Sequence, residues 1–196
     1  MEIITLTSLK NIDKFLSFCK EAYTETDKLA SENMWDDNWE SKPHTLPYII
    51  FYTNRFKYPN GEFHIAVDNN NIIGCSGIYR SDFCKDIGIA GCRTWIDKKY
   101  RNKSVAREFL LPADKKWAVD NDIKIICLTF NNYNKNLIEI WKRYRLGENR
   151  TTRKPYHLFY NNFNELTYPV NIQYTSQWII YEKLDNNFNY DWEKIL

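Results

Sequence analysis

Three strand-like segments joined by short turns constrain the fold of this chain more than any other feature. Apolar residues alternate with polar or small ones from Phe63 to Val67, and similar segments follow at 72–80 and 87–97. The connections are the turn-forming residues 68–71 and the stretch SDFCKD. Because connections this short cannot carry a crossover, the segments predict an antiparallel meander.

Helices and further strands surround this meander. Helical spacing or a helix-start proline predicts helices at 11–29, 47–57, 105–117 and 137–144. Pro112 is expected to kink or split the third helix, whose apolar face Val105, Phe109, Ala113 and Trp117 define. Strands are also predicted at 3–6, 123–130, 155–160 and 177–184. The order predicts one layered α+β or α/β domain over residues 1–196, with 185–196 as a possible C-terminal arm.

Composition excludes several classes of protein. No apolar run reaches the length of a membrane span, and no secretory signal is visible, so a cytoplasmic protein is expected. The five cysteines are scattered without a CxxC pair, which argues against a disulfide framework and against a metal site. Those at 75, 92 and 127 fall in strand-like segments, where buried reduced thiols are expected. The formal net charge of +2 is too small to indicate nucleic-acid binding by itself.

The segment YRNKSVAREFLL at 100–111 places a basic loop between a predicted strand and a predicted helix. A loop that opens a helix directs backbone N–H groups and the positive end of the helix dipole at an anion, so a pyrophosphate would fit there. Ser104 is small and is a favoured residue at a helix N-cap. The alternative interpretation is a basic surface turn with Ser104 as a plain cap.

The element order and this loop resemble the GCN5-related N-acetyltransferase (GNAT) family. The family signature is Arg or Gln, two variable residues, Gly, one variable residue, and Gly or Ala. Arg101 and Ala106 match it, whereas Ser104 departs from the Gly. The resemblance implies an α-β-α layered domain with a mixed, mostly antiparallel sheet of about seven strands and helices on both faces.

The resemblance also implies an acetyl-CoA-dependent N-acyltransferase, in which an amine of a small molecule or peptide attacks the thioester directly. Acetyl-CoA would be the co-substrate, with no metal. Its pantetheine arm would pair with the backbone of Arg93, Thr94, Trp95 and Ile96. Its pyrophosphate would lie on Arg101, Asn102, Lys103, Ser104, Val105 and Ala106. A second partial match begins at Asn134, which is also expected to contact the cofactor.

Catalytic and acceptor residues are less well marked. The second partial match places Trp141 where the family commonly has a Tyr that protonates the departing thiolate, and Tyr144 lies one turn later as a substitute general acid. The acceptor pocket is expected to use Trp35, Trp39, Tyr48, Tyr79 and Cys92. Strict alternation along 87–97 would place Cys92 with Gly88, Ala90 and Thr94 on one face, opposite Ile87, Ile89, Gly91, Arg93 and Trp95. Neither face offers a general base, and Glu62, His64, Tyr79 and Asp86 remain conceivable.

Two other interpretations stay open. The Ser104 and Trp141 departures would also fit a catalytically degenerate GNAT-fold interaction module. The basic clusters at 98–107 and 142–154 would fit a nucleic-acid partner such as tRNA. The tail and the aromatic content are compatible with a homodimer.

Overall fold

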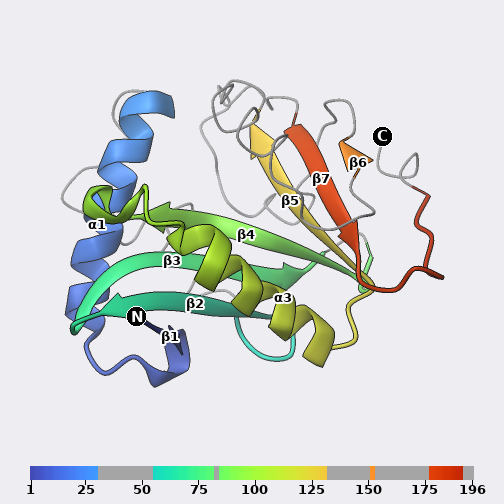
Figure 1. Ribbon diagram of the computed structural model, residues 1–196, viewed down its shortest axis with the longest axis horizontal. Helices are drawn as coiled ribbons and strands as arrows, with labels where there is room; N and C mark the ends of the chain where they lie inside the picture. The colour runs from blue at the N-terminus through green and yellow to red at the C-terminus, as the bar shows by residue number, and fades with distance from the viewer. Residues whose placement is uncertain (31–54, 82–83, 132–150, 153–176, 192–196) are drawn as a thin grey trace, which may run out of the picture.

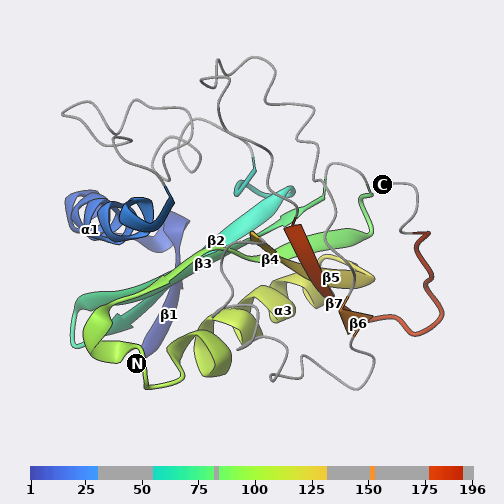
Figure 2. The same ribbon diagram turned by 90° about the horizontal axis from the view of Figure 1, so that it is seen from above.

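The computed structural model describes residues 1–30, 55–81, 84–131, 151–152 and 177–191. In these residues a seven-stranded sheet has the order β1-β2-β3-β4-β5-β7-β6, and every neighbouring pair is antiparallel except β4 and β5. Helix α1 covers one face and α3 the other (Figures 1 and 2). The mixed, mostly antiparallel sheet with helices on both faces is therefore confirmed.

The elements have the following bounds. The strands are β1 (Glu2–Thr5), β2 (Gly61–Asp68), β3 (Asn71–Arg80), β4 (Ile87–Ile96), β5 (Ile125–Asn131), β6 (Thr151–Thr152) and β7 (Gln177–Lys183). The helices are the 3-10 helix Leu6–Ser8, α1 (Ile12–Ala30), the 3-10 helix Lys98–Tyr100, the π-helical turn Ala106–Leu110 and α3 (Leu111–Asp120). No helix among the described residues is both long and apolar enough to cross a membrane.

The predicted meander is present as β2, β3 and β4. Asn69 and Asn70 connect β2 to β3, and their φ angles are 48° and 63°. Positive φ at both central residues suits the two-residue turns that match the twist of a hairpin, and Asn tolerates it better than most residues. The two asparagines therefore favour the turn that sets the pairing of β2 with β3.

Two apolar layers hold the helices on the sheet. On the α1 face, the ring of Phe18 meets Trp95 edge-on at 4.8 Å, and Phe15 meets Phe63 at 6.0 Å. On the α3 face, Trp117 packs in a buried cluster with Ile78, Ala90, Ala118, Ile123 and Ile126. Strand β5 contributes to both layers, and its residues 125–128 are all buried, as the uninterrupted apolar run predicts.

The helix after β4 is split at Pro112, as expected. Pro112 lies in the first turn of α3, and the N–H of Leu111 donates to the carbonyl of Ala106 across a π-helical turn. The wider turn accommodates a proline that has no N–H to donate. It also shifts the buried face, so the expectation for Phe109 and Ala113 is wrong: both are only half-buried. Val105 and Trp117 are buried as expected, and Leu110, Leu111, Asp114 and Ala118 are buried with them.

The later part of the chain is described only in places. Strand β7 confirms the strand predicted at 177–184, and β6 was not predicted. Residues 55–57, the end of the helix predicted at 47–57, form a turn. The rest of that helix, the helix at 137–144 and the strand at 155–160 lie outside the described residues. After β7, Phe188 and Tyr190 pack against the core cluster on the α1 face.

Candidate functional site

Strands β4 and β5 separate after a short parallel ladder. Only Ile87–Ile89 of β4 pair with Ile125–Cys127 of β5 among the described residues. Beyond that point the two strands diverge, while β4 stays on β3 as far as Ile96 (Figure 1). The edge of β4 that faces away from β3 is then the kind of backbone edge to which an extended ligand can add hydrogen bonds.

Strand β4 carries two bulges in the part that has left β5. Its pairing with β3 shifts between Tyr79 and Gly77, and again between Gly77 and Cys75. Each shift inserts one extra residue into β4, and each contains a residue of positive φ, Gly91 at 65° and Arg93 at 57°. An arginine in this region is strained, and such strain concentrates at functional sites.

Because of the bulges, the side chains of β4 do not all lie on the faces predicted by strict alternation. Cys92 packs with the apolar cluster on the α1 face, together with Ile89 and Trp95, and not on the face of Thr94. The space above Gly91 is bounded by Leu111 of α3 and Leu128 of β5, so Gly91 faces α3. Strict alternation failed because two extra residues in one strand reverse the side-chain direction twice.

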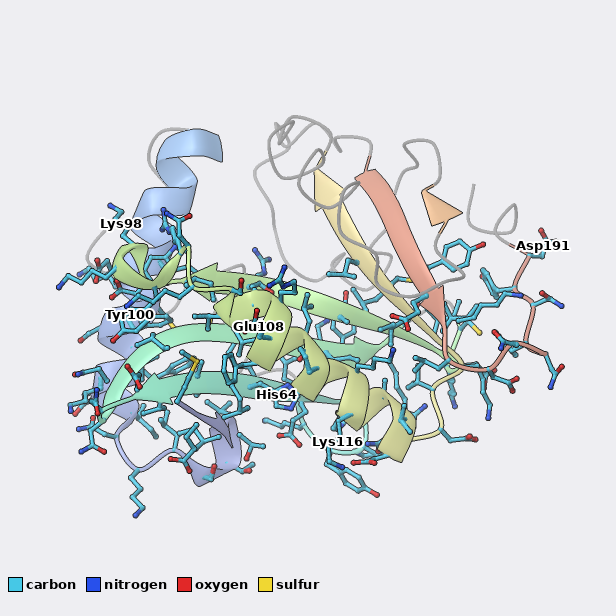
Figure 3. The ribbon with its side chains drawn as sticks, in the orientation of Figure 1. His64, Lys98, Tyr100, Glu108, Lys116 and Asp191 are labelled. Carbon is cyan, nitrogen blue, oxygen red and sulfur yellow. The ribbon has the colours of Figure 1, made fainter. Side chains whose placement is uncertain are left out.

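Beneath the bulges lies a buried polar network that the sequence did not indicate. Asp114 of α3 has no exposed surface, and its carboxylate has three partners. Its Oδ1 lies 2.7 Å from His64 Nδ1 of β2, and its Oδ2 accepts from Ser76 Oγ of β3 at 2.7 Å and from the Gly91 N–H at 3.0 Å. Figure 3 shows His64 between β2 and α3. The network therefore joins three strands to one helix.

These residue types also occur in serine hydrolases, but the connections differ here. Ser76 donates to Asp114 and not to the histidine, and Ser76 and His64 are only 0% and 6% exposed. A nucleophilic serine needs the imidazole as its base and an open path to the substrate. In this arrangement the buried polar groups of His64, Ser76 and Asp114 satisfy one another's hydrogen bonds. Its sequence signal was weak: Asp114 lies three residues before Trp117 on the buried side of a helix.

The basic loop begins where β4 ends. Asp97 Oδ1 accepts from the N–H of Lys99 at 2.8 Å and so starts the 3-10 helix Lys98–Tyr100, both of whose ends Figure 3 labels. Tyr100 donates to Asp68 Oδ2 at 3.1 Å, and this hydrogen bond is the main cause that raises the pKa of Tyr100. These contacts fasten the loop to the hairpin of β2 and β3.

Arg101 turns back onto the end of β4. Its Nε donates to the carbonyl of Ile96 at 3.0 Å, and its guanidinium lies 5.5 Å from the centre of the Trp95 ring. Both of those residues belong to the predicted pantetheine segment. A basic side chain therefore bridges the two predicted cofactor segments, 93–96 and 101–106.

Ser104 adopts a conformation that favours glycine. Its φ is 56°, at the position where the family signature has Gly. Ser104 stands at the start of the helix, because its carbonyl accepts from the N–H of Glu108 at 2.8 Å, and its Oγ accepts from Arg107 Nη2 at 3.1 Å. The loop thus has, at the position of the signature glycine, a backbone conformation that glycine adopts readily.

Replacing Ser104 with glycine is expected to raise the free energy of unfolding by about 0.5–1 kcal/mol, because the left-handed conformation costs glycine much less than serine. Urea denaturation checks this change. Ser104→Ala, which keeps a Cβ, should be no more stable than the wild type, and equal stabilisation by both substitutions would contradict the explanation.

The predicted acceptor residues are only partly described. The ring of Tyr79 is buried on the α1 face beneath the guanidinium of Arg55, at 4.5 Å from the ring centre. Cys92, half-buried, packs against the same cluster. Trp35, Trp39 and Tyr48 lie outside the described residues, as do Asn134, Trp141 and Tyr144.

The candidate general bases lie in different surroundings. The imidazole of His64 is engaged by Asp114, and Asp86 lies in the turn before β4, where its carbonyl accepts from the N–H groups of Lys124 and Ile125. Glu62 of β2 is half-buried, and burial raises the pKa of its carboxyl group. A raised pKa suits a general base, and Glu62 pairs with Ile78, which lies on β3 between the residues that flank the first bulge, Gly77 and Tyr79.

The strand cysteines are protonated core thiols. Burial raises the pKa of Cys75 to about 12, and burial also raises the pKa of Cys92 and Cys127. A thiol must ionise to act as a nucleophile, so these pKa values argue against Cys92 as a covalent acyl carrier.

The same pKa shifts predict a loss of stability in alkali. Above the ordinary thiol pKa of 9.0, the unfolded chain loses protons that the folded chain retains, so stability falls as pH rises toward 12. Each such thiol should cost up to about 1.4 kcal/mol per pH unit in this range. Urea unfolding at pH 8 and pH 10, under reducing conditions, measures the loss. The loss should be smaller in Cys75→Ala, and an unchanged pH difference would contradict the assignment.

A family model identifies this architecture. The model of the acetyltransferase (GNAT) family matches residues 26–146, which is more than half of the chain. The chain belongs to the GNAT family. The matched region runs from α1 through β5, so it includes the bulged strand of this GNAT protein and the loop that follows it.

Solved GNAT structures share the fold over nearly the whole chain. A GNAT-family acetyltransferase from Staphylococcus aureus Mu50 is 17% identical, with a TM-score of 0.60 over 94% of this chain and 99% of that one. The PaiA N-acetyltransferase from Thermoplasma acidophilum, solved with coenzyme A, is 13% identical, with a TM-score of 0.61 over 93% and 99%. The ribosomal-protein-alanine N-acetyltransferase from Brucella melitensis is 10% identical, with a TM-score of 0.61 over 94% and 100%. No curated protein matches.

Proposed function

We propose that this GNAT protein is an acetyl-CoA-dependent N-acyltransferase that acetylates an amine of a small molecule or peptide. The observation that carries the proposal is the continuity of β4 with the loop at 101–106. A doubly bulged strand that has left its parallel neighbour leads into a helix-opening loop, and Ser104, at the signature position of glycine, has the positive φ that glycine favours. The family membership supports the same reaction class.

In this proposal the acyl-CoA lies along the edge of β4 that faces away from β3. Its pantetheine arm pairs with the backbone of Arg93–Ile96, and its pyrophosphate rests on Arg101–Ala106 at the start of the helix. A backbone N–H near the bulges stabilises the oxyanion formed when the amine attacks the thioester carbonyl. Tyr144 remains the predicted general acid for the departing thiolate, with Trp141 at the position where the family commonly has that Tyr.

Two of the similar structures support an amine as the acceptor. Both are N-acetyltransferases by name, and the one from Thermoplasma acidophilum was solved with coenzyme A. The guanidinium of Arg55, over the buried Tyr79 ring and beside Cys92, supplies a positive charge on the α1 face for an acceptor that bears a carboxylate.

Titration with acetyl-CoA, coenzyme A and dephospho-coenzyme A tests the proposal. Ligand at about a hundred times its Kd should stabilise the fold by about 2.7 kcal/mol, which raises Tm by roughly 5–10 °C. Ser104→Pro should abolish the shift, because proline cannot take a φ of 56°. Asp122→Pro is the matched control, since Asp122 has a φ of 58° in the turn beyond α3.

A screen of amine acceptors, with release of free coenzyme A as the readout, then separates an enzyme from an interaction module. Binding without turnover on any amine would favour the degenerate module. No binding at millimolar acetyl-CoA would overturn the proposed function, and titration with tRNA at several salt concentrations would then test the nucleic-acid alternative.

A further inference from the structure

We propose that Asp114 is a positioning residue that fixes the bulged segment of β4 for the thioester end of acetyl-CoA. This role rests on the proposed function. It differs from substrate contact, because Asp114 is fully buried under α3 and reaches the reacting atoms only through the backbone of β4.

The first step of the argument is the contact to the bulge itself. Asp114 Oδ2 accepts from the Gly91 N–H at 3.0 Å, and Thr94 Oγ1 donates to the Gly91 carbonyl at 2.8 Å. Both polar groups of Gly91 are therefore held on the α3 side. The peptide planes on either side of this residue cannot rotate without breaking one of these bonds, so the direction in which the following N–H and C=O groups point is fixed.

The second step is the closure of the network around the carboxylate. Ser76 Oγ donates to Asp114 Oδ2 and also lies 3.0 Å from Thr94 Oγ1, while His64 holds Oδ1 from the other side. Ser76 therefore holds β3 to the same acceptor as Gly91 of the first bulge, and its Oγ lies against the Thr94 hydroxyl of the second. Because partners from three strands contact the carboxylate, its orientation is set by all three.

The third step is the connection to the phosphate-binding loop. Asp114 stands on the helix that opens directly after Ser104, whose carbonyl accepts from the N–H of Glu108 at 2.8 Å. The π-helical turn Ala106–Leu110 and α3 follow this loop directly, so the loop and the carboxylate lie on consecutive turns of the same helical segment.

A purely structural role would be served as well by apolar side chains. Replacing buried charged and polar groups by apolar ones of similar volume is often neutral or stabilising, so such a network is weak evidence for stability alone. What an apolar cluster could not supply is an acceptor for the Gly91 N–H at a fixed place. We therefore expect the network to fix the backbone geometry of the bulge at Gly91.

Asp114→Asn tests the role, with acetyl-CoA and adenosine 3′,5′-bisphosphate as probes. The bisphosphate has nucleotide phosphates but neither pantetheine nor acyl group. The Kd for acetyl-CoA should rise about tenfold, which is the loss of one charge-assisted hydrogen bond, whereas the Kd for the bisphosphate should stay within about twofold. The Gly91 amide signal in the NMR spectrum should move in the same variant. Asp120→Asn, on the exposed side of the same helix, is the matched control.

Each outcome decides between alternatives. Equal weakening of both probes would show a general loss of structure, and unchanged acetyl-CoA binding would show that the bulge does not depend on Asp114; either result overturns the role. If Asp114→Asn does not fold, Thr94→Val removes the hydroxyl that holds the Gly91 carbonyl and should give the same selective loss. If the wild type binds the bisphosphate but not acetyl-CoA, the positioning role is wrong while phosphate binding stands. If it binds neither probe, the proposed function itself fails.

Discussion

Asp114→Ala is expected to lower the free energy of unfolding by about 3–5 kcal/mol. The substitution removes the partner of two buried side chains, His64 and Ser76, and of the part-buried Gly91 N–H, and each unsatisfied buried group costs about 1–3 kcal/mol. For a chain of this length, Tm should fall by roughly 10 °C. Urea and thermal denaturation measure both quantities. Asp120→Ala removes an exposed ion pair with Lys116 from the same helix and should cost less than about 1 kcal/mol.

Combining Asp114→Leu with His64→Phe and Ser76→Ala sharpens this result. The triple variant removes the donors on two side chains together with their acceptor, so much of the lost stability should return. The Gly91 N–H remains unsatisfied, so recovery should be incomplete. Losses that simply add over the three sites would contradict a network in which the partners depend on one another.

Gly91→Ala is expected to destabilise the fold by about 2–3 kcal/mol. Its φ of 65° costs a residue with a Cβ roughly 1–2 kcal/mol, and the added Cβ would lie 2.7 Å from Leu128 Cδ2. Because leucine is flexible, that overlap should add only about 1 kcal/mol. Denaturation in urea gives the magnitude, and loss of acetyl-CoA binding should accompany it.

Arg93→Gly is the informative counterpart, since Arg93 has a φ of 57° but an exposed side chain. Removing its Cβ relieves strain without opening a cavity, so stability should hold or rise by up to about 1 kcal/mol. A large loss in this variant would mean that the side chain, and not the backbone shape, holds the second bulge.

Local signals in the sequence were enough to predict the frame of the fold. Paired asparagines at 69 and 70 gave the hairpin turn, Pro112 gave the split helix, and the apolar run at 123–130 gave a strand buried on both faces. Each of these features depends on residues that are neighbours in the chain. Their physical causes are therefore visible without knowledge of the tertiary structure.

The details of the candidate site depend on contacts that the sequence does not display. Nothing in the letters of 87–97 indicates that two residues are extra, because a bulge is a property of the pairing with β3. In the sequence, Asp114 is an ordinary polar residue of an amphipathic helix. Its partners His64, Ser76 and Gly91 are 50, 38 and 23 residues away and meet it only in the folded structure. The φ of Ser104 likewise follows from how the loop joins strand to helix.

The three parallel pairs between β4 and β5 divide the sheet into two antiparallel parts. Strands β2, β3 and β4 follow one another through short turns. Strand β5, which ends at Asn131, pairs antiparallel with β7, which begins only at Gln177. Closing a long loop costs more chain entropy than closing a short one, so the first part should form earlier during folding. Pulsed hydrogen exchange should then protect the β2 and β3 amides before those of β5 and β7, and the reverse order would contradict this sequence of events. The place where β4 and β5 diverge is thus also the boundary between strands expected to fold early, β2 to β4, and strands expected to fold late, β5 and β7.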